Sequence, residues 1–212
     1  MGRTDMTRLA EKSSRDMDAL RALLDAVPLA HVGMVADGSP LVVPTAVARD
    51  GDTLLIHGST GSRWMRRLAE GAEASVAVTA MDAVVVARSG FESSFRYRSA
   101  VLFGRFSPVA GPGKEAALNR LVDRLVPGRS AELRPATARE LAATLLLRMP
   151  IAEWSLKVSA GWPEDEEADV AGPAWAGVVP MRTVFGEPVP APDLRAAIPV
   201  PPSVRTLAEP GG

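Results

Sequence analysis

A loop of glycine and hydroxyl residues followed by arginines is the part of this sequence best equipped for chemistry. The loop begins at His57 and Gly58, continues to Ser62 and leads into Arg63 at the start of a basic helix. Glycines let the backbone come close to a ligand, and the free N–H groups at a helix start favour an anion. Arg63 and Arg66 add guanidinium groups, which match phosphate in two-point fashion. The pattern predicts a monophosphate site, or else a helix start that Ser62 simply caps.

Apolar runs and turn signals predict the strands that position this loop. Residues 29–35, 41–48 and 53–57 are rich in Val, Leu and Ile. Asp37-Gly38 separates the first two runs, and Asp50-Gly51-Asp52 separates the last two, as in hairpin turns. The three runs therefore predict an antiparallel meander that ends at the loop.

The rest of the chain predicts further strands and several helices. Residues 74–80 and 83–87 predict two strands broken by Met81-Asp82, and 97–106 and 151–158 predict two more. Helices are expected over residues 16–27, 61–71 and 117–125, and from Thr137, where Glu140 completes a capping box. Short strands without strand–helix–strand alternation indicate a mainly β fold of the α+β class, a closed or nearly closed antiparallel barrel with flanking helices.

Three segments are expected along the chain. Residues 1–15 form a loose N-terminal segment, residues 16–180 the folded domain, and residues 181–212 a proline-rich tail that wraps the domain or a partner subunit. The acidic stretch 164–169 is expected to be a solvated loop.

Composition limits the kinds of function. The 212 residues are 47% hydrophobic, with a net charge of −1, so the balance does not favour nucleic acid or an anionic membrane as a partner. Cysteine is absent, which removes thiolate catalysis, zinc–sulfur sites and iron–sulfur clusters. With only His31 and His57 as imidazoles, no metal site is expected. No run approaches a membrane span or a signal peptide, so a cytoplasmic location is expected.

The order of several short motifs resembles a known family. The matching segments, in chain order, are Val43-Pro44-Thr45-Ala46, His57-Gly58, Ser62-Arg63, the strand from Arg98 to Gly104, and Trp175 to Pro180. In this order the chain resembles the flavin-binding split β-barrel superfamily typified by pyridoxamine 5′-phosphate oxidase, and more narrowly its nitroimidazole-reductase-like and flavin-nucleotide-binding branch.

The resemblance implies a six-stranded antiparallel split β-barrel that forms a homodimer with FMN at its interface. The strand with Val43, Pro44, Thr45 and Ala46 would lie along the flavin ring. The implied contacts to the ribityl chain and phosphate are His57, Gly58, Ser59, Ser62 and Arg63. Arg98 and Ser99 would reach the flavin from a later strand, or Arg98 is a solvated arginine at a strand start. Trp64 replaces a lysine of the oxidase, and Arg66 is a substitute for its charge.

These expectations point to an FMN-dependent oxidoreductase that passes electrons from a reduced nicotinamide to a small acceptor. Vitamin B6 oxidation is not expected, because the oxidase's Arg-x-His near its C-terminus has no counterpart after His57. His57 is a candidate proton donor beside the flavin, or a residue that only shapes the loop. His31 is expected to be a buried core histidine. A non-enzymatic flavin carrier or sensor, or a barrel that binds deazaflavin or haem, is the alternative.

Overall fold

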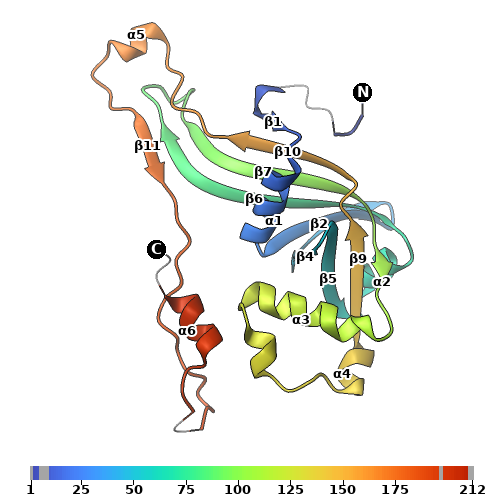
Figure 1. Cartoon of the computed structure of the whole chain (residues 1–212). Helices are drawn as coiled ribbons and strands as arrows, with labels where there is room; N and C mark the ends of the chain where they lie inside the picture. The colour runs from blue at the N-terminus through green and yellow to red at the C-terminus, as the bar shows by residue number, and fades with distance from the viewer. Residues whose placement is uncertain (1, 5–9, 196–197, 210–212) are drawn as a thin grey trace.

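Two antiparallel sheets with short flanking helices make up the protein (Figure 1). The computed structural model describes residues 2–4, 10–195 and 198–209. The helices are α1 (Met17–Ala26), α2 (Arg63–Ala69), α3 (Gly113–Leu125), α4 (Ala138–Ala143), α5 (Glu167–Val170) and α6 (Pro202–Ala208), with 3₁₀ turns η1 (Ala10–Lys12) and η2 (Arg129–Glu132). Across these described ranges, no helix is both long and apolar enough to cross a bilayer.

The larger sheet has the order β1-β10-β7-β6-β2-β3, and β11 pairs with the far half of β6. Its strands are β1 (Ser13–Ser14), β2 (Leu29–Ala36), β3 (Ser39–Ala46), β6 (Glu73–Val86), β7 (Ser94–Arg105), β10 (Glu153–Ser159) and β11 (Gly177–Pro180). β1 belongs to the segment 1–15 that was expected to be loose, and residues 1 and 5–9 of that segment lie outside the described residues.

The smaller sheet has the order β4-β5-β9-β8. Its strands are β4 (Ala48–Asp50), β5 (Thr53–Ser59), β8 (Ser107–Pro108) and β9 (Thr144–Pro150). Strand pairing thus joins the described strands into two separate sheets. The expected antiparallel α+β class is correct, but the six-stranded barrel is only approximated, because the pairing does not close into one ring.

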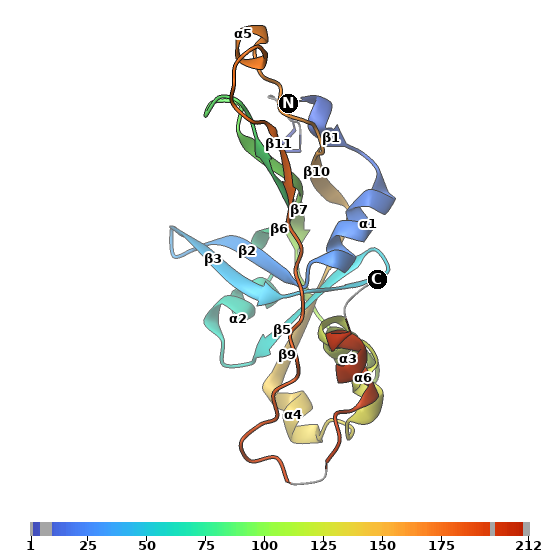
Figure 2. The same cartoon turned by 90° about the vertical axis from the view of Figure 1, so that its left-hand side faces the viewer.

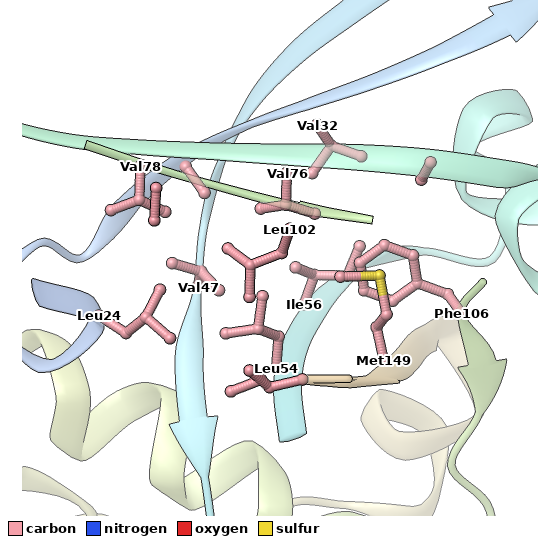
Figure 3. Close-up of a cluster of buried hydrophobic side chains, with 14 of the residues drawn as sticks. Leu24, Val32, Val47, Leu54, Ile56, Val76, Val78, Leu102, Phe106 and Met149 are labelled. Carbon is pink, nitrogen blue, oxygen red and sulfur yellow. The ribbon is translucent and has the colours of Figure 1, made fainter. Parts of the chain in front are cut away.

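The main core lies between the two sheets (Figure 3). β5 contributes Leu54 and Ile56, and β6 and β7 contribute Val76 and Leu102 from the facing side. Because side chains alternate along a strand, Leu55 points the other way and packs under α3 in a second small cluster with Ala48, Ala117, Leu121 and Leu146. β5 is therefore covered on both faces, which fixes its register.

β6 is one long strand where the sequence predicted two. The prediction of a break at Met81-Asp82 is wrong, because the pairing of β6 with β7 continues past it with a shift in register between Met81 and Ala83. One extra residue there forms a bulge, which leaves the strand intact while bending it. The two long strands therefore extend beyond the core as a ribbon, and β11 pairs with the extended part of β6 (Figure 1).

The acidic stretch 164–169 is mostly exposed, as predicted, but it is not all loop, because α5 begins at Glu167, and one of its carboxylates is buried. The Asp165 side chain is 1% exposed and accepts hydrogen bonds from the Arg88 backbone N–H at 2.6 Å and its guanidinium at 2.9 Å. Nearby, the Arg96 guanidinium lies 4.8 Å from the centre of the Trp162 ring. These contacts hold the segment after β10 against the end of the ribbon.

The C-terminal tail runs along the outside of the body between β11 and α6 (Figures 1 and 2). Within its described residues, the stretch between these two elements has no regular secondary structure. α6 is fastened to η2, because the Ser203 backbone N–H and hydroxyl donate to the Glu132 carboxylate at 3.0 and 2.6 Å.

Candidate functional site

The outer face of the larger sheet carries exposed apolar side chains around a histidine. Along β2, Ala30, Val32 and Met34 point into the core, while Leu29 and Val35 are 49% and 68% exposed. His31 lies on this outer face and is exposed, so the prediction of a buried core histidine is wrong. Its apolar neighbours in sequence point to the opposite side of the strand, which is why the local composition was misleading.

Small side chains surround His31 on this face. In the sheet register His31 is opposite Pro44 of β3 and Ala77 of β6, and Ala77 is opposite Val101 of β7. Neighbouring strands lie about 4.8 Å apart, so these residues form one short row with little height above the backbone. The row is a flat floor with one imidazole rising from it.

A hollow of about 480 Å³ adjoins this floor. Gly33, Val42, Ser75 and Phe103 line it, and Arg3 lies at its edge. A Cβ on Gly33 would come 2.8 Å from the Ser75 hydroxyl oxygen, so the glycine allows the Ser75 side chain to lie against the backbone of β2. The hollow is therefore mainly apolar, with the guanidinium of Arg3 and the carboxylate of Glu73 also among its lining groups.

Arg3 is held at the edge of the hollow by charge and by an aromatic ring. Its guanidinium lies 4.7 Å from the centre of the Phe103 ring and donates to Glu153 at 2.6 and 2.7 Å, and it also pairs with Glu73. These hydrogen bonds lower the pKa of both carboxyl groups, because they favour the charged form.

The strand predicted to lie along a flavin ring sends alternate residues to opposite faces. Pro44 is exposed on the outer face, whereas Val43 and Thr45 lie opposite the buried Val32 and Ala30 and point toward the core side. Ala46 lies opposite Leu29 on the outer face. Of the four predicted residues, only Pro44 and Ala46 therefore present their side chains to that face.

The predicted anion loop is a tight turn between β5 and α2. The Gly61 backbone N–H donates to the Ser59 hydroxyl at 3.1 Å, and the Ser62 backbone N–H donates to the Ser59 carbonyl at 2.9 Å. The Thr60 backbone N–H donates to the Ala143 carbonyl at 3.0 Å, which fastens the loop to the end of α4, directly before β9. Ser62 is at the N-cap of α2, but its side chain makes no capping hydrogen bond. Its hydroxyl is therefore not used by the cap.

The positive charge at the loop is already paired. Arg63 Nη2 lies 2.7 Å from an oxygen of Asp37, and Arg67 pairs with the other oxygen of the same carboxylate. Arg66, the expected substitute for the oxidase lysine, is exposed and is not one of the two arginines that pair with Asp37. With Trp64, the two paired arginines and Asp37 line a cavity of about 240 Å³.

His57 lies at the same strand end but points away from α2. It is opposite Leu146 of β9 and exposed on the side that carries Leu55 and α3. Gly58 points the other way, and a Cβ on it would lie 3.0 Å from Met65 of α2. The structure therefore brings Gly58 close to α2 and places the imidazole of His57 on the other face.

Arg98 and Ser99 lie on opposite faces of β7. Arg98 makes two hydrogen bonds to Asp82, at 2.8 and 3.0 Å, which raise the pKa of its guanidinium. Ser99 is opposite Thr79 and Lys157 and shares the outer face with Val101. Only Ser99 of this pair is placed toward the floor around His31.

Sequence reasoning missed Asp37 and Arg67. Asp37 was interpreted only as a turn residue, and it does adopt the left-handed conformation, with φ of 53°. The signal available was the four-residue spacing of Arg63 and Arg67, which places both on one helix face. Among the residues whose positions are described, no cluster of three or more histidine or acidic side chains could hold a metal ion by itself.

Comparisons with known proteins identify similar chains. The family described as pyridoxamine 5′-phosphate oxidase matches residues 16–158. An FAD- and haem-binding protein from Mycobacterium smegmatis is 56% identical, with a TM-score of 0.90, and the match covers 93% of this chain and 97% of that one. The flavocytochrome Anf3 from Azotobacter vinelandii is 36% identical, with the same TM-score and coverage of 98% and 97%.

A candidate 5-nitroimidazole antibiotic resistance protein from Bacteroides thetaiotaomicron is more distant. It is 17% identical, with a TM-score of 0.59 and coverage of 69% of this chain and 86% of that one, so it shares the fold. A comparison with curated proteins gave no match.

Proposed function

Because the chain belongs to the pyridoxamine 5′-phosphate oxidase family, we propose that it is a redox protein that binds a flavin together with a haem. One observation carries the proposal: the relative that is 56% identical over nearly the whole length of both chains is an FAD- and haem-binding protein. The sequence resemblance implied FMN, but that relative binds FAD, so FAD is the flavin proposed here.

The outer face of the larger sheet suits a flat flavin ring. Its floor is built of Pro44, Ala77 and Val101 around His31, and the hollow lined by Gly33 and Ser75 lies beside it. We assign the ring to this face, along the backbone of β3 and within reach of Ser99. The phosphate is assigned to the loop, where Arg63 and the hydroxyl groups of Ser59 and Ser62 are the donors.

The haem iron needs an axial ligand, and the chain has two imidazoles for it. His31 rises from an apolar floor with Leu29 and Val35 on the same strand face, and His57 is exposed at the end of β5. We propose that one of these two histidines is the ligand.

The proposed activity is electron transfer from a reduced nicotinamide to a small acceptor. When bound, the flavin supplies two-electron chemistry and the haem iron one-electron chemistry. The protein's residues bind and orient both groups and exclude water. Oxidation of a vitamin B6 phosphate is not proposed, because no histidine follows His57.

We also propose that two copies of the chain form a homodimer through the outer sheet face. Leu29, Val35 and Val42 are 49%, 68% and 62% exposed there, and such apolar surface favours association. The dimer would enclose the floor around His31 and complete the flavin site. Light scattering after gel filtration should give twice the chain mass for the wild type and the chain mass for Val42→Asp. A wild-type monomer would contradict the dimer.

The absorption spectrum of the purified protein tests the cofactors. A haem Soret band together with flavin bands is expected, and chromatography of the released flavin should identify FAD. Release of FMN instead would show that the flavin is the one implied by the sequence resemblance. A colourless protein that takes up neither flavin nor haem would overturn the proposal.

Single alanine variants at the two histidines identify the haem ligand. The variant at the ligand should lose the Soret band while it keeps its flavin bands and its circular dichroism, and the other variant serves as its control. Retention of the Soret band by His31→Ala and by His57→Ala alike would rule out histidine ligation.

Anaerobic addition of NADH or NADPH tests the enzymatic proposal. Bleaching of the flavin within seconds supports an oxidoreductase. A flavin that stays oxidised with both nicotinamides would favour the carrier or sensor.

A further inference from the structure

The Asp37 carboxylate faces two guanidinium groups at the loop assigned to phosphate. It lies in the turn between β2 and β3, and it accepts a hydrogen bond from Arg63 at 2.7 Å and another from Arg67. The two arginines are four residues apart on α2, so both reach the same point. Together with Trp64 they line the cavity of about 240 Å³.

We propose that Asp37 makes this site select a pyrophosphate diester, as in FAD, over a phosphate monoester, as in FMN. The inference rests on the proposed function, which assigns the flavin phosphate to Arg63. It concerns the charge of the ligand that the cluster accepts, which the family resemblance does not specify.

The charges of the cluster support this selectivity. Arg63, Arg67 and Asp37 carry one net positive charge between them. A monoester phosphate has a second pKa near 6 and carries almost two negative charges on one phosphate group at pH 7.5, whereas the pyrophosphate of FAD carries one charge on each of its two linked phosphates. The Asp37 carboxylate therefore repels the terminal phosphate of FMN more strongly than either phosphate of FAD.

The ion pairs of this cluster are poorly placed to stabilise the fold. The Arg63 side chain is 73% exposed and that of Asp37 is 54% exposed. Exposed pairs contribute little to stability, because solvent screens them. The cluster can therefore change partners when an anion binds without a large cost to the folded state.

The substitution Asp37→Asn tests the charge alone. Asparagine has nearly the same shape and tolerates the left-handed conformation of the turn, where φ is 53°. Asp52→Asn is a matched control, because Asp52 also lies in a hairpin turn, is also 54% exposed and pairs with Arg21. Dissociation constants for FAD, FMN and riboflavin are measured by calorimetry on protein freed of its flavin.

Asp37→Asn should tighten FMN binding relative to FAD by about twofold to fourfold. The upper figure corresponds to one unit of extra charge at about 5 Å in water, and the lower figure allows for the second charge of FAD at about 8 Å. Riboflavin binding should not change, because riboflavin has no phosphate, and Asp52→Asn should leave all three constants as in the wild type.

Two results would overturn the inference, and they are distinguishable. If the wild type binds FAD and the FMN-to-FAD ratio is the same in Asp37→Asn, the charge selection is wrong while the proposed function stands. If the wild type binds none of the three flavins, the proposed function fails and the selectivity fails with it.

Discussion

At the scale of single residues, ion pairs between arginines and carboxylates recur throughout the structure. The exposure of each arginine distinguishes pairs that hold the fold together from pairs that a ligand can reach. Arg88 and the buried Asp165 hold a segment in place. Arg98 is bound at two points by Asp82 across the ribbon. Arg63 differs, because its side chain is 73% exposed beside a cavity. It is therefore the arginine of these three that a ligand can reach.

Replacement of Arg63 by alanine should weaken flavin binding. The loss of a charged hydrogen-bond partner costs roughly 1.5–3 kcal/mol, which is about tenfold to a hundredfold in the dissociation constant. Flavin titration of the purified variant measures it. Arg66→Ala is the control, since it removes the same charge from the same helix at an exposed position. Equal flavin affinities for the wild type and Arg63→Ala would contradict the assignment of the flavin phosphate to this loop.

Single-residue predictions succeeded where sequence neighbours are also neighbours in space. The turn from Ser59 to Ser62 and its arginine at the start of α2 follow directly from local residue types. The exposure of His31 and the partner of Arg63 depend on which strand face meets which element. A single sequence does not contain that information, because β2 and α2 meet only through the fold.

At the scale of elements, local hydrogen bonding defines the short helix α4. The prediction of a capping box at Thr137 and Glu140 is confirmed, because the Thr137 hydroxyl accepts from the Glu140 backbone N–H and the Glu140 carboxylate accepts from the Thr137 backbone N–H. Arg134 adds two further hydrogen bonds to the same carboxylate, at 2.6 and 2.9 Å. These donors lower the pKa of Glu140 well below its usual value.

Glu140→Gln should lower the stability of the protein at neutral pH. The difference from the wild type should disappear at acidic pH. The lowered pKa in the folded state means that the charged carboxylate stabilises the protein above its ordinary value of 4.5, and this contribution is lost as the pH falls through the folded pKa. Melting temperatures of the wild type and the variant should therefore differ at pH 7 and converge on acidification. A difference that does not depend on pH would contradict this account.

Elements were predictable to the extent that their signals are local. The hairpin β2–β3, the helices α1, α3 and α4, and the alternating strand β10 lie close to their predicted positions. The bulge at Met81 was invisible in the sequence, because Met81-Asp82 is equally compatible with a turn. The separation into two sheets depends on pairing between distant strands such as β5 and β9, which local patterns do not encode.

At the scale of the whole molecule, the tail is held at two distant places and exposed between them. β11 is paired with β6, and α6 is tied to η2 by Glu132. Between them Val184 and Val189 are 82% and 89% exposed. Exposed apolar side chains on a segment that is held at both ends favour contact with a second copy of the chain, in line with the proposed dimer.

Removal of the Glu132 carboxylate should release α6. Glu132→Ala loses both hydrogen bonds from Ser203, so trypsin should cut at Arg182 and Arg195 several times faster than in the wild type. Glu167→Ala, which removes an exposed carboxylate in α5, is the control. Mass spectrometry of the early fragments reads out the result, and equal cleavage rates in both variants would show that other contacts hold the tail.

The hydrogen bond between Thr60 and Ala143 has a consequence for biosynthesis. The loop's partner lies in a part of the chain that a ribosome makes much later, after β6, β7 and α3. Contacts between such distant segments close slowly, because a long stretch of chain must first be ordered. The larger sheet can therefore begin to pair during synthesis, while the loop assigned to phosphate gains its final support only once β9 has emerged. If a flavin binds as proposed, its loading would accordingly be a late event in the maturation of this protein.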